Sequence, residues 1–231
     1  DGNGRAFTCA FHGFTWNLDG TLRYIPSRWD FPDVQDDKFC LTPVKVETWG
    51  GFVFINMNPA AEPLAKFLGD LPNHFAVWKP EDRYIQAHVA KVMPCNWKVC
   101  QEAFMGAYHV VLTHPQLLPG IGDENSQYDV WGNFSRAITP NGTPSPHLKW
   151  QPNEQEMFDS MSDRPFDEPA VAEVPSGGRA RQLSAAAGRA GLQDVVGDNG
   201  GLSDAELADS IYYTLFPNFH PWGGYNRIVY R

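Results

Sequence analysis

Three things are scarce in this sequence: long apolar runs, basic residues and cysteines. No stretch of about 18 consecutive apolar residues occurs, so we expect no membrane-spanning helix. Lys and Arg number 18 against 27 Asp and Glu, and the net charge of −9 disfavours a nucleic-acid or anionic-membrane partner, because both bind basic surfaces. The 4 cysteines lack the dense spacing of a disulfide framework, which favours reduced thiols or metal ligands in the cytoplasm.

The two ends also lack features of a complete chain. The first residues, DGNGRAFT, contain neither an initiator Met nor the basic and apolar regions of a signal peptide. The last residues, NRIVYR, alternate like a strand and stop without a turn. We therefore expect an internal fragment of a longer protein.

What is present predicts an α+β protein. The chain has 231 residues, 42% of them hydrophobic, which suits one large domain or two small ones. Residues 1–57 combine glycines, aromatics and short alternating runs, which predicts a small all-β module. We expect a connector with one short helix over residues 58–82 and a mixed domain over residues 83–231.

Local signals predict individual elements. The LDG sequence at 18–20 indicates a hairpin, and Gly50-Gly51 indicates a tight turn or a bulge. Residues 83–93 alternate like a strand, and residues 96–114 read as one long helix that Pro115 stops.

Later segments are mixed. The runs SQYDVWGNFSRAITP, IYYTLFPN and YNRIVYR are strand-like, whereas residues 151–202 are poor in aromatics and predict an irregular, partly helical segment that covers a pocket. Ser203 and Glu206 have the spacing of a capping box.

The first chemical motif is Cys9-x-x-His12. A thiolate and an imidazole at this spacing can reach a metal from one tight loop. Zinc and iron–sulfur centres need four ligands, so the pair supplies half of a closed site. The alternative is a buried thiol beside a histidine in a turn.

The second motif is His109-x4-His114. Five helical positions rotate a side chain by about 140°, so both rings can meet one metal only if the helix distorts or ends between them. Glu102, seven positions before His109, is a candidate carboxylate on nearly the same face. The alternative is two capping or surface histidines, which are favoured near a helix C-terminus.

Taken in order, these motifs resemble the α subunit of Rieske-type non-haem iron, aromatic-ring-hydroxylating oxygenases. CAFHGFTWNLDG is similar to the second ligand loop of the Rieske domain, and WGGFVFINMNP to its closing strands. NWKVCQEAFMGAYHVVLTHP resembles the segment that carries the mononuclear iron histidines, and LFPNFHPW resembles a strand facing that pocket.

The resemblance implies a truncated all-β Rieske domain followed by a helix-grip catalytic domain, in which an antiparallel sheet surrounds a long helix. Cys9 and His12 would bind a [2Fe–2S] cluster, one on each iron. His109 and His114 would bind Fe(II) in a site with two histidines and a carboxylate. Phe104 would line the substrate pocket.

The same resemblance implies the reaction and the partners. The protein would activate O2 and hydroxylate an aromatic or other hydrophobic substrate, with Leu112 as a further pocket residue. Electrons would come from a reductase, with or without a ferredoxin. The assembly would be a homotrimer or a hetero-hexamer.

The sequence departs from the family pattern at three places. No Cys or His precedes Cys9, so an upstream Cys-x-His pair is not present, and no residue matches the carboxylate of the iron site. Gly106 stands where the family has an Asp or Glu that bridges to a cluster histidine of the neighbouring subunit, and Ala103 replaces a common Asn. We expect truncation to explain the first two departures but not Gly106.

Two rival functions stay open. A helix-grip protein that binds a hydrophobic ligand without redox chemistry would account for Gly106 and the missing ligands. A hydrolytic zinc enzyme would leave the aromatic-rich β module without a purpose. Among single residues, His220 is a candidate for the pocket, and buried thiols without a disulfide are expected at Cys40, Cys95 and Cys100.

Overall fold

The computed structural model describes residues 3–161, 172–197, 201–224 and 229–230. The chain divides into two compact units, one up to Leu64 and one from Ala65 onward. Among the described residues, no helix has the length and apolar character needed to span a membrane.

The first unit consists of short strands and turns. Its elements are β1 (Phe7–Thr8), β2 (Thr15–Trp16), β3 (Leu22–Tyr24), η1 (Arg28–Asp30), η2 (Asp36–Phe39), β4 (Lys45–Trp49) and β5 (Phe52–Asn56). Strands β1, β2 and β3 form one antiparallel sheet, and β4 pairs with β5. The predicted hairpin at 18–20 and tight turn at 50–51 are confirmed, and Gly50 and Gly51 both have positive φ, as a two-residue hairpin turn of type I′ requires.

The second unit is built on an antiparallel sheet, so the α+β class is confirmed. Its strands are β6 (Gln127–Trp131), β7 (Phe134–Thr139) and β8 (Ser210–Leu215), in that order, with a separate pair of β9 (His220–Pro221) and β10 (Val229–Tyr230). Strand β7 pairs with both neighbours, so that Arg136 lies opposite Asp129 on one side and Tyr213 on the other.

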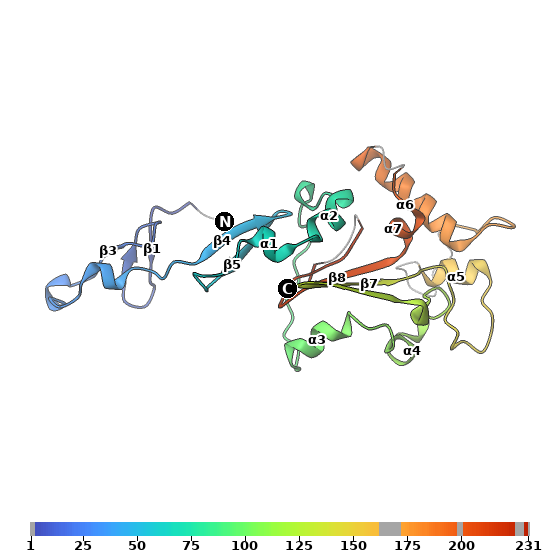
Figure 1. The fold of residues 1–231 in the computed structure, drawn as a ribbon, viewed down its shortest axis with the longest axis horizontal. Coiled ribbons are helices and arrows are strands. Elements are labelled where there is room, and N and C mark those ends of the chain that lie inside the picture. Colours follow the sequence, from blue (N-terminus) through green and yellow to red (C-terminus); the bar gives the residue numbers. More distant parts are fainter. Residues whose placement is uncertain (1–2, 162–171, 198–200, 225–228, 231) are drawn as a thin grey trace. The chain divides into compact units, whose positions relative to one another are not determined.

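Helices surround this sheet. They are α1 (Leu64–Leu68), α2 (Leu71–Phe75), η3 (Ala76–Trp78), η4 (Pro80–Asp82), α3 (Trp97–Ala103), α4 (Val110–Thr113), η5 (Pro115–Leu117), η6 (Asp123–Asn125), α5 (Glu154–Ser160), α6 (Ala180–Val196) and α7 (Asp204–Ala208). In Figure 1, α3 and α4 lie below strands β7 and β8, whereas α2, α6 and α7 lie above them.

The two faces of the sheet have different neighbours because strand side chains alternate. Phe134 and Tyr213 share one face, where aromatic contacts join them to His74 and Phe75 of α2. The opposite face carries small or polar residues such as Ala137, and it borders a small cavity. The core therefore lies on the α2 side of the sheet.

The predicted strand over 83–93 is wrong. This segment is irregular, and no strand among the described residues pairs with it. Its apolar side chains point into solvent, with Val89 87% and Val92 95% exposed. Alternation favours an extended backbone, but a strand also needs a partner to accept and donate its backbone hydrogen bonds.

The predicted continuous helix over 96–114 is also wrong. It is two helices, α3 and α4, separated by residues 104–109. The amide N–H of Ala107 donates to the Tyr128 hydroxyl at 3.0 Å, so a side chain replaces the carbonyl that a continuing helix would supply. Gly106, a poor helix residue, lies inside the break.

The segment over 151–202 is more helical than its composition predicts. Met157 and Phe158 of α5 pack with Ala180 of α6 in a small core. The capping box at Ser203 and Glu206 is confirmed at the start of α7. The predicted strand YNRIVYR lies outside the described residues, except for Val229–Tyr230 in β10.

Candidate functional site

The candidate iron site lies at the break between α3 and α4. Asn96 caps α3, where its side-chain oxygen accepts the amide N–H of Lys98 at 2.9 Å. Beyond the break, Ala107 and Val110 pack with Leu118 in a buried cluster. The cluster and the Tyr128 hydrogen bond anchor the chain immediately before and within α4.

His109 and His114 stand at the two ends of α4. His109 is the N-cap, and His114 is the C-cap with φ −131° and ψ 51°, where the chain leaves the helix. Their ring centroids are 5.4 Å apart, and the ring planes meet at 74°. Helix α4 thus ends at His114, which lets the two imidazole rings approach each other despite their five-residue spacing. Both rings are half-buried.

The hydrogen bonding of His109 determines which nitrogen can bind a metal. Its Nδ1 lies 2.7 Å from the carbonyl oxygen of Gly106. Because a carbonyl oxygen only accepts, Nδ1 carries the hydrogen, and the lone pair is on Nε2. A hydrogen bond of this kind orients many metal-binding histidines.

The described residues do not complete a metal site. Nowhere in the described part of the chain do three His, Cys, Asp or Glu side chains come together in a way that could hold a metal ion. Glu102 is exposed and does not join the two histidines as a third ligand. The histidine pair therefore supplies two imidazole donors, fewer than a closed metal site needs.

Gly106 contributes its backbone carbonyl and leaves space beside it. A Cβ atom at this position would meet no other atom within 4 Å, and its φ is not in the positive range. A Cβ atom would consequently fit here without displacing a neighbour.

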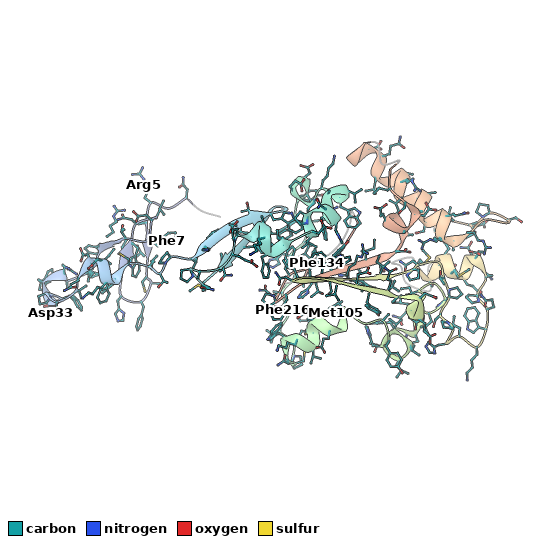
Figure 2. All side chains as sticks on the ribbon, in the orientation of Figure 1. Arg5, Phe7, Asp33, Met105, Phe134 and Phe216 are labelled. Carbon is teal, nitrogen blue, oxygen red and sulfur yellow. The ribbon has the colours of Figure 1, made fainter. Side chains whose placement is uncertain are left out.

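A cavity of about 90 Å³ lies between the break and the sheet. Phe104 and Met105, the latter labelled in Figure 2, line it from the break. Ala137 of β7 and Thr214 of β8 are among the residues that line it from the sheet. Leu112, in contrast, is 90% exposed and does not line this cavity.

His220 lies next to this cavity. Its Nδ1 is 3.3 Å from the hydroxyl oxygen of Thr214, which is a lining residue. Burial lowers the pKa of the His220 imidazole, because the charged form loses solvation. The ring is therefore held in its neutral form near pH 7.

The other predicted ligands, Cys9 and His12, lie in the turn between β1 and β2. The turn closes through the amide N–H of Gly13, which donates to the Cys9 carbonyl at 2.9 Å. Backbone N–H groups of Phe11 and His12 lower the pKa of the Cys9 thiol, because they donate to its sulfur. Thiolate is the form that binds metals, so the loop fits two of the four ligands of a cluster.

The predicted burial of the remaining cysteines is wrong. Cys40 and Cys95 are exposed rather than buried, and Cys100 is partly exposed. The short elements around them leave one side of each thiol open to solvent, since Cys40 follows η2 and Cys95 precedes α3.

Sequence reasoning missed two features. One is the Tyr128 hydroxyl, which accepts the amide N–H of Ala107 at the break in the predicted helix. The sequence indicated only that Tyr128 lies in a strand. The other is a cavity of about 720 Å³ that contains none of the predicted site residues. Its two arginines already have carboxylate partners, since Arg179 binds Glu154 and Arg181 binds Asp209.

The second unit matches a known protein family. The profile of the ring hydroxylating alpha subunit (catalytic domain) family matches residues 75–221. The carnitine monooxygenase oxygenase subunit of Escherichia coli strain K12 is 30% identical over 139 residues, which are 58% of this chain and 37% of that protein. The large oxygenase component of the naphthalene 1,2-dioxygenase system of Pseudomonas putida is 31% identical over 129 residues, which are 51% and 28% respectively.

Solved structures share the fold. Naphthalene 1,2-dioxygenase with indole bound has a TM-score of 0.52 at 20% identity, over 99% of this chain and 52% of that chain. The quaternary ammonium Rieske monooxygenase CntA with L-carnitine has a TM-score of 0.52 at 24% identity, over 60% and 40%. The chain spans less than two fifths of the length of the two curated relatives. Because the family profile covers more than half of its residues, this chain belongs to the ring-hydroxylating oxygenase α-subunit family.

Proposed function

We propose that the chain is part of a cytoplasmic oxygenase component that activates O2 and hydroxylates an aromatic or other hydrophobic substrate. A reductase, with or without a ferredoxin, supplies its electrons, and the subunits form a homotrimer or a hetero-hexamer. The named relatives include a carnitine monooxygenase and a naphthalene dioxygenase, which supports oxygenase chemistry. All 4 cysteines are free thiols, as suits a reducing compartment.

The observation that carries this proposal is the pair of histidines around α4. His109 and His114 would hold Fe(II), with Nε2 of His109 directed to the metal by the bond from Nδ1 to Gly106. When bound, the iron supplies the O2 chemistry. The chain itself would position the metal and exclude water on the sheet side, where Phe104 borders the cavity.

The first unit has the corresponding role in electron transfer. We assign residues 1–57 to part of a Rieske domain, residues 58–82 to a connector, and residues 83–231 to a helix-grip catalytic domain. Cys9 and His12 would bind one iron each of a [2Fe–2S] cluster. The lowered pKa of Cys9 supports this assignment, because it increases the share of thiolate, the form that binds metals.

The cavity beside the break supports a hydrophobic substrate. Phe104, Met105 and Val130 give it apolar walls. Ligand pockets have about 300–1,000 Å³, so this cavity of about 90 Å³ would hold only the reactive end of a substrate. Leu112 is 90% exposed and is not assigned to this pocket.

The test is the iron content of the complete α subunit. We expect His109→Ala to lose most of the mononuclear iron, because one of two histidine ligands is removed, while the acid-labile sulfide of the cluster is retained. His88→Ala is the matched control, since His88 is exposed and lies in the irregular segment before α3. Unchanged iron stoichiometry in His109→Ala would refute the assignment.

A non-enzymatic, hydrophobic-ligand-binding protein is the second candidate. Gly106 favours it, because glycine cannot form the acid bridge that the family uses between subunits. Binding of a hydrophobic ligand without iron, and without O2 consumption when electrons are supplied, would support this alternative over the oxygenase.

A further inference from the structure

Cys95 and Cys100 are brought together by the start of α3. Asn96 is the N-cap, so Cys95 is the residue before the cap and Cys100 is the fourth residue of the helix. Side chains at these two positions commonly touch, and two apolar residues there form a hydrophobic staple. Here the two residues are thiols, and their Sγ atoms are 3.1 Å apart.

Solvent and small oxidants can reach this pair. Cys95 is exposed, and Cys100 is partly exposed. The preceding residues Val92 and Met93 are exposed too, so no packed layer covers the sulfurs from that side. Two accessible thiols in contact are the arrangement in which oxidation leads to a disulfide.

We propose that Cys95 and Cys100 form a redox-active dithiol that hydrogen peroxide converts to an intramolecular disulfide. The Cys100 thiolate attacks one peroxide oxygen, the O–O bond breaks, and a sulfenic acid and water result. The Cys95 sulfur then attacks the sulfenic sulfur, the S–S bond forms and a second water leaves. The two thiols lose two electrons and two protons in total, and one peroxide is reduced to two waters.

The geometry requires only a small movement. The sulfurs must approach from 3.1 Å to a bond length of about 2.0 Å, which side-chain rotation at the exposed Cys95 can provide. The hydrogen bond with Cys100 raises the pKa of the Cys95 thiol, so Cys95 is the poorer nucleophile toward peroxide. We therefore assign the first attack to Cys100.

Tryptic mapping tests the proposal directly. Trypsin cleaves after Lys91, Lys98 and Arg136, and it therefore separates the two cysteines into peptides 92–98 and 99–136. After peroxide treatment of the reduced chain, we expect these two peptides to be joined and the free thiols to fall from 4 to two per chain. Dithiothreitol should restore all 4 thiols, and non-reducing electrophoresis should show a monomer.

Matched variants separate this pair from the other thiols. Cys40→Ser, which removes another exposed cysteine, should still lose two thiols and give the joined peptides. Cys95→Ser should lose the joined peptides and accumulate a sulfenic acid on Cys100 that dimedone labels. In urea, disulfide formation in the original chain should be severalfold slower, because the start of α3 no longer holds the sulfurs together.

Three results would overturn the proposal: free Cys95 and Cys100 after the other thiols have reacted, a disulfide between two chains, or equal oxidation rates in the folded and urea-unfolded states. The inference uses only thiols of this chain and requires no bound iron. Its failure would therefore leave the proposed oxygenase function untouched, and the reverse also holds.

Discussion

At the scale of single residues, Gly106 combines a backbone contact to His109 with empty space where a side chain would stand. Its carbonyl orients His109, which any residue could do, since the backbone supplies the bond. Its missing side chain leaves open space, because a Cβ atom added there would have no neighbour within 4 Å. A substitution at Gly106 therefore begins without a steric clash at Cβ.

This space leads to a prediction for Gly106→Glu in the complete oxygenase. We expect a severalfold or greater rise in turnover per iron, because a carboxylate could bridge to a cluster histidine of the next subunit. Gly106→Gln is the matched control, since it adds a side chain of similar size without the charge. Both variants lower the entropy of the unfolded chain to the same extent, which stabilises the fold by about 0.4–1 kcal/mol. Equal turnover in both variants would contradict a role for an acid at this position.

The sequence alone predicted part of the chemistry of the individual site residues. The motif Cys9-x-x-His12 and the pair His109-x4-His114 supplied the candidate donors, because ligand type and spacing are local properties. The hydrogen bond from His109 Nδ1 to Gly106 was not predicted, since the sequence pattern indicated a continuous helix in which that carbonyl would accept from a backbone N–H.

At the scale of elements, the break between α3 and α4 depends on strand β6. The Tyr128 hydroxyl accepts the amide N–H of Ala107, two positions before His109. Ala107 is buried, so without this acceptor its N–H would have poor access to water. The edge of the sheet therefore positions the histidine that follows.

We predict that Tyr128→Phe lowers the free energy of unfolding by about 1 kcal/mol, because it removes one hydrogen bond and leaves a buried donor without its acceptor. Urea denaturation measures this loss, and iron affinity should fall with it. Tyr84→Phe is the control, since Tyr84 is 84% exposed in the irregular segment. An unchanged denaturation midpoint in Tyr128→Phe would show that water replaces the hydroxyl.

Elements with local signals were predicted well, and those that depend on distant partners were not. The Gly50-Gly51 turn and the Ser203–Glu206 capping box are confirmed, because a few adjacent residues determine each of them. The segment 83–93 has the alternation of a strand, but no described strand pairs with it.

At the scale of the whole molecule, the two units differ in how much core they have. Among the described residues of the first unit, Ile25 is the single buried apolar side chain. The second unit has most of the buried residues, including Leu71, Tyr213 and Leu215 around its sheet. Hydrophobic burial therefore stabilises the second unit far more than the first.

We predict that, without bound metal, backbone amides of the first unit exchange with deuterium much faster than those of β7 and β8. Local opening costs little free energy where few apolar contacts are lost. Mass spectrometry of exchanged peptides from residues 45–56 and 134–139 gives the comparison, since both contain paired strands. Similar protection in the two sets would show that the first unit is stabilised by something other than its own core.

The sequence by itself determined the α+β class, the hairpin turns at 18–20 and 50–51 and the capping box at Ser203 and Glu206, since each depends on neighbouring residues. Only the tertiary structure decided that the helix breaks before His109 and that the two imidazoles converge. The break depends on Tyr128, which is 21 positions from Ala107. A contact over that separation depends on how the whole chain folds back on itself, which local pattern does not specify.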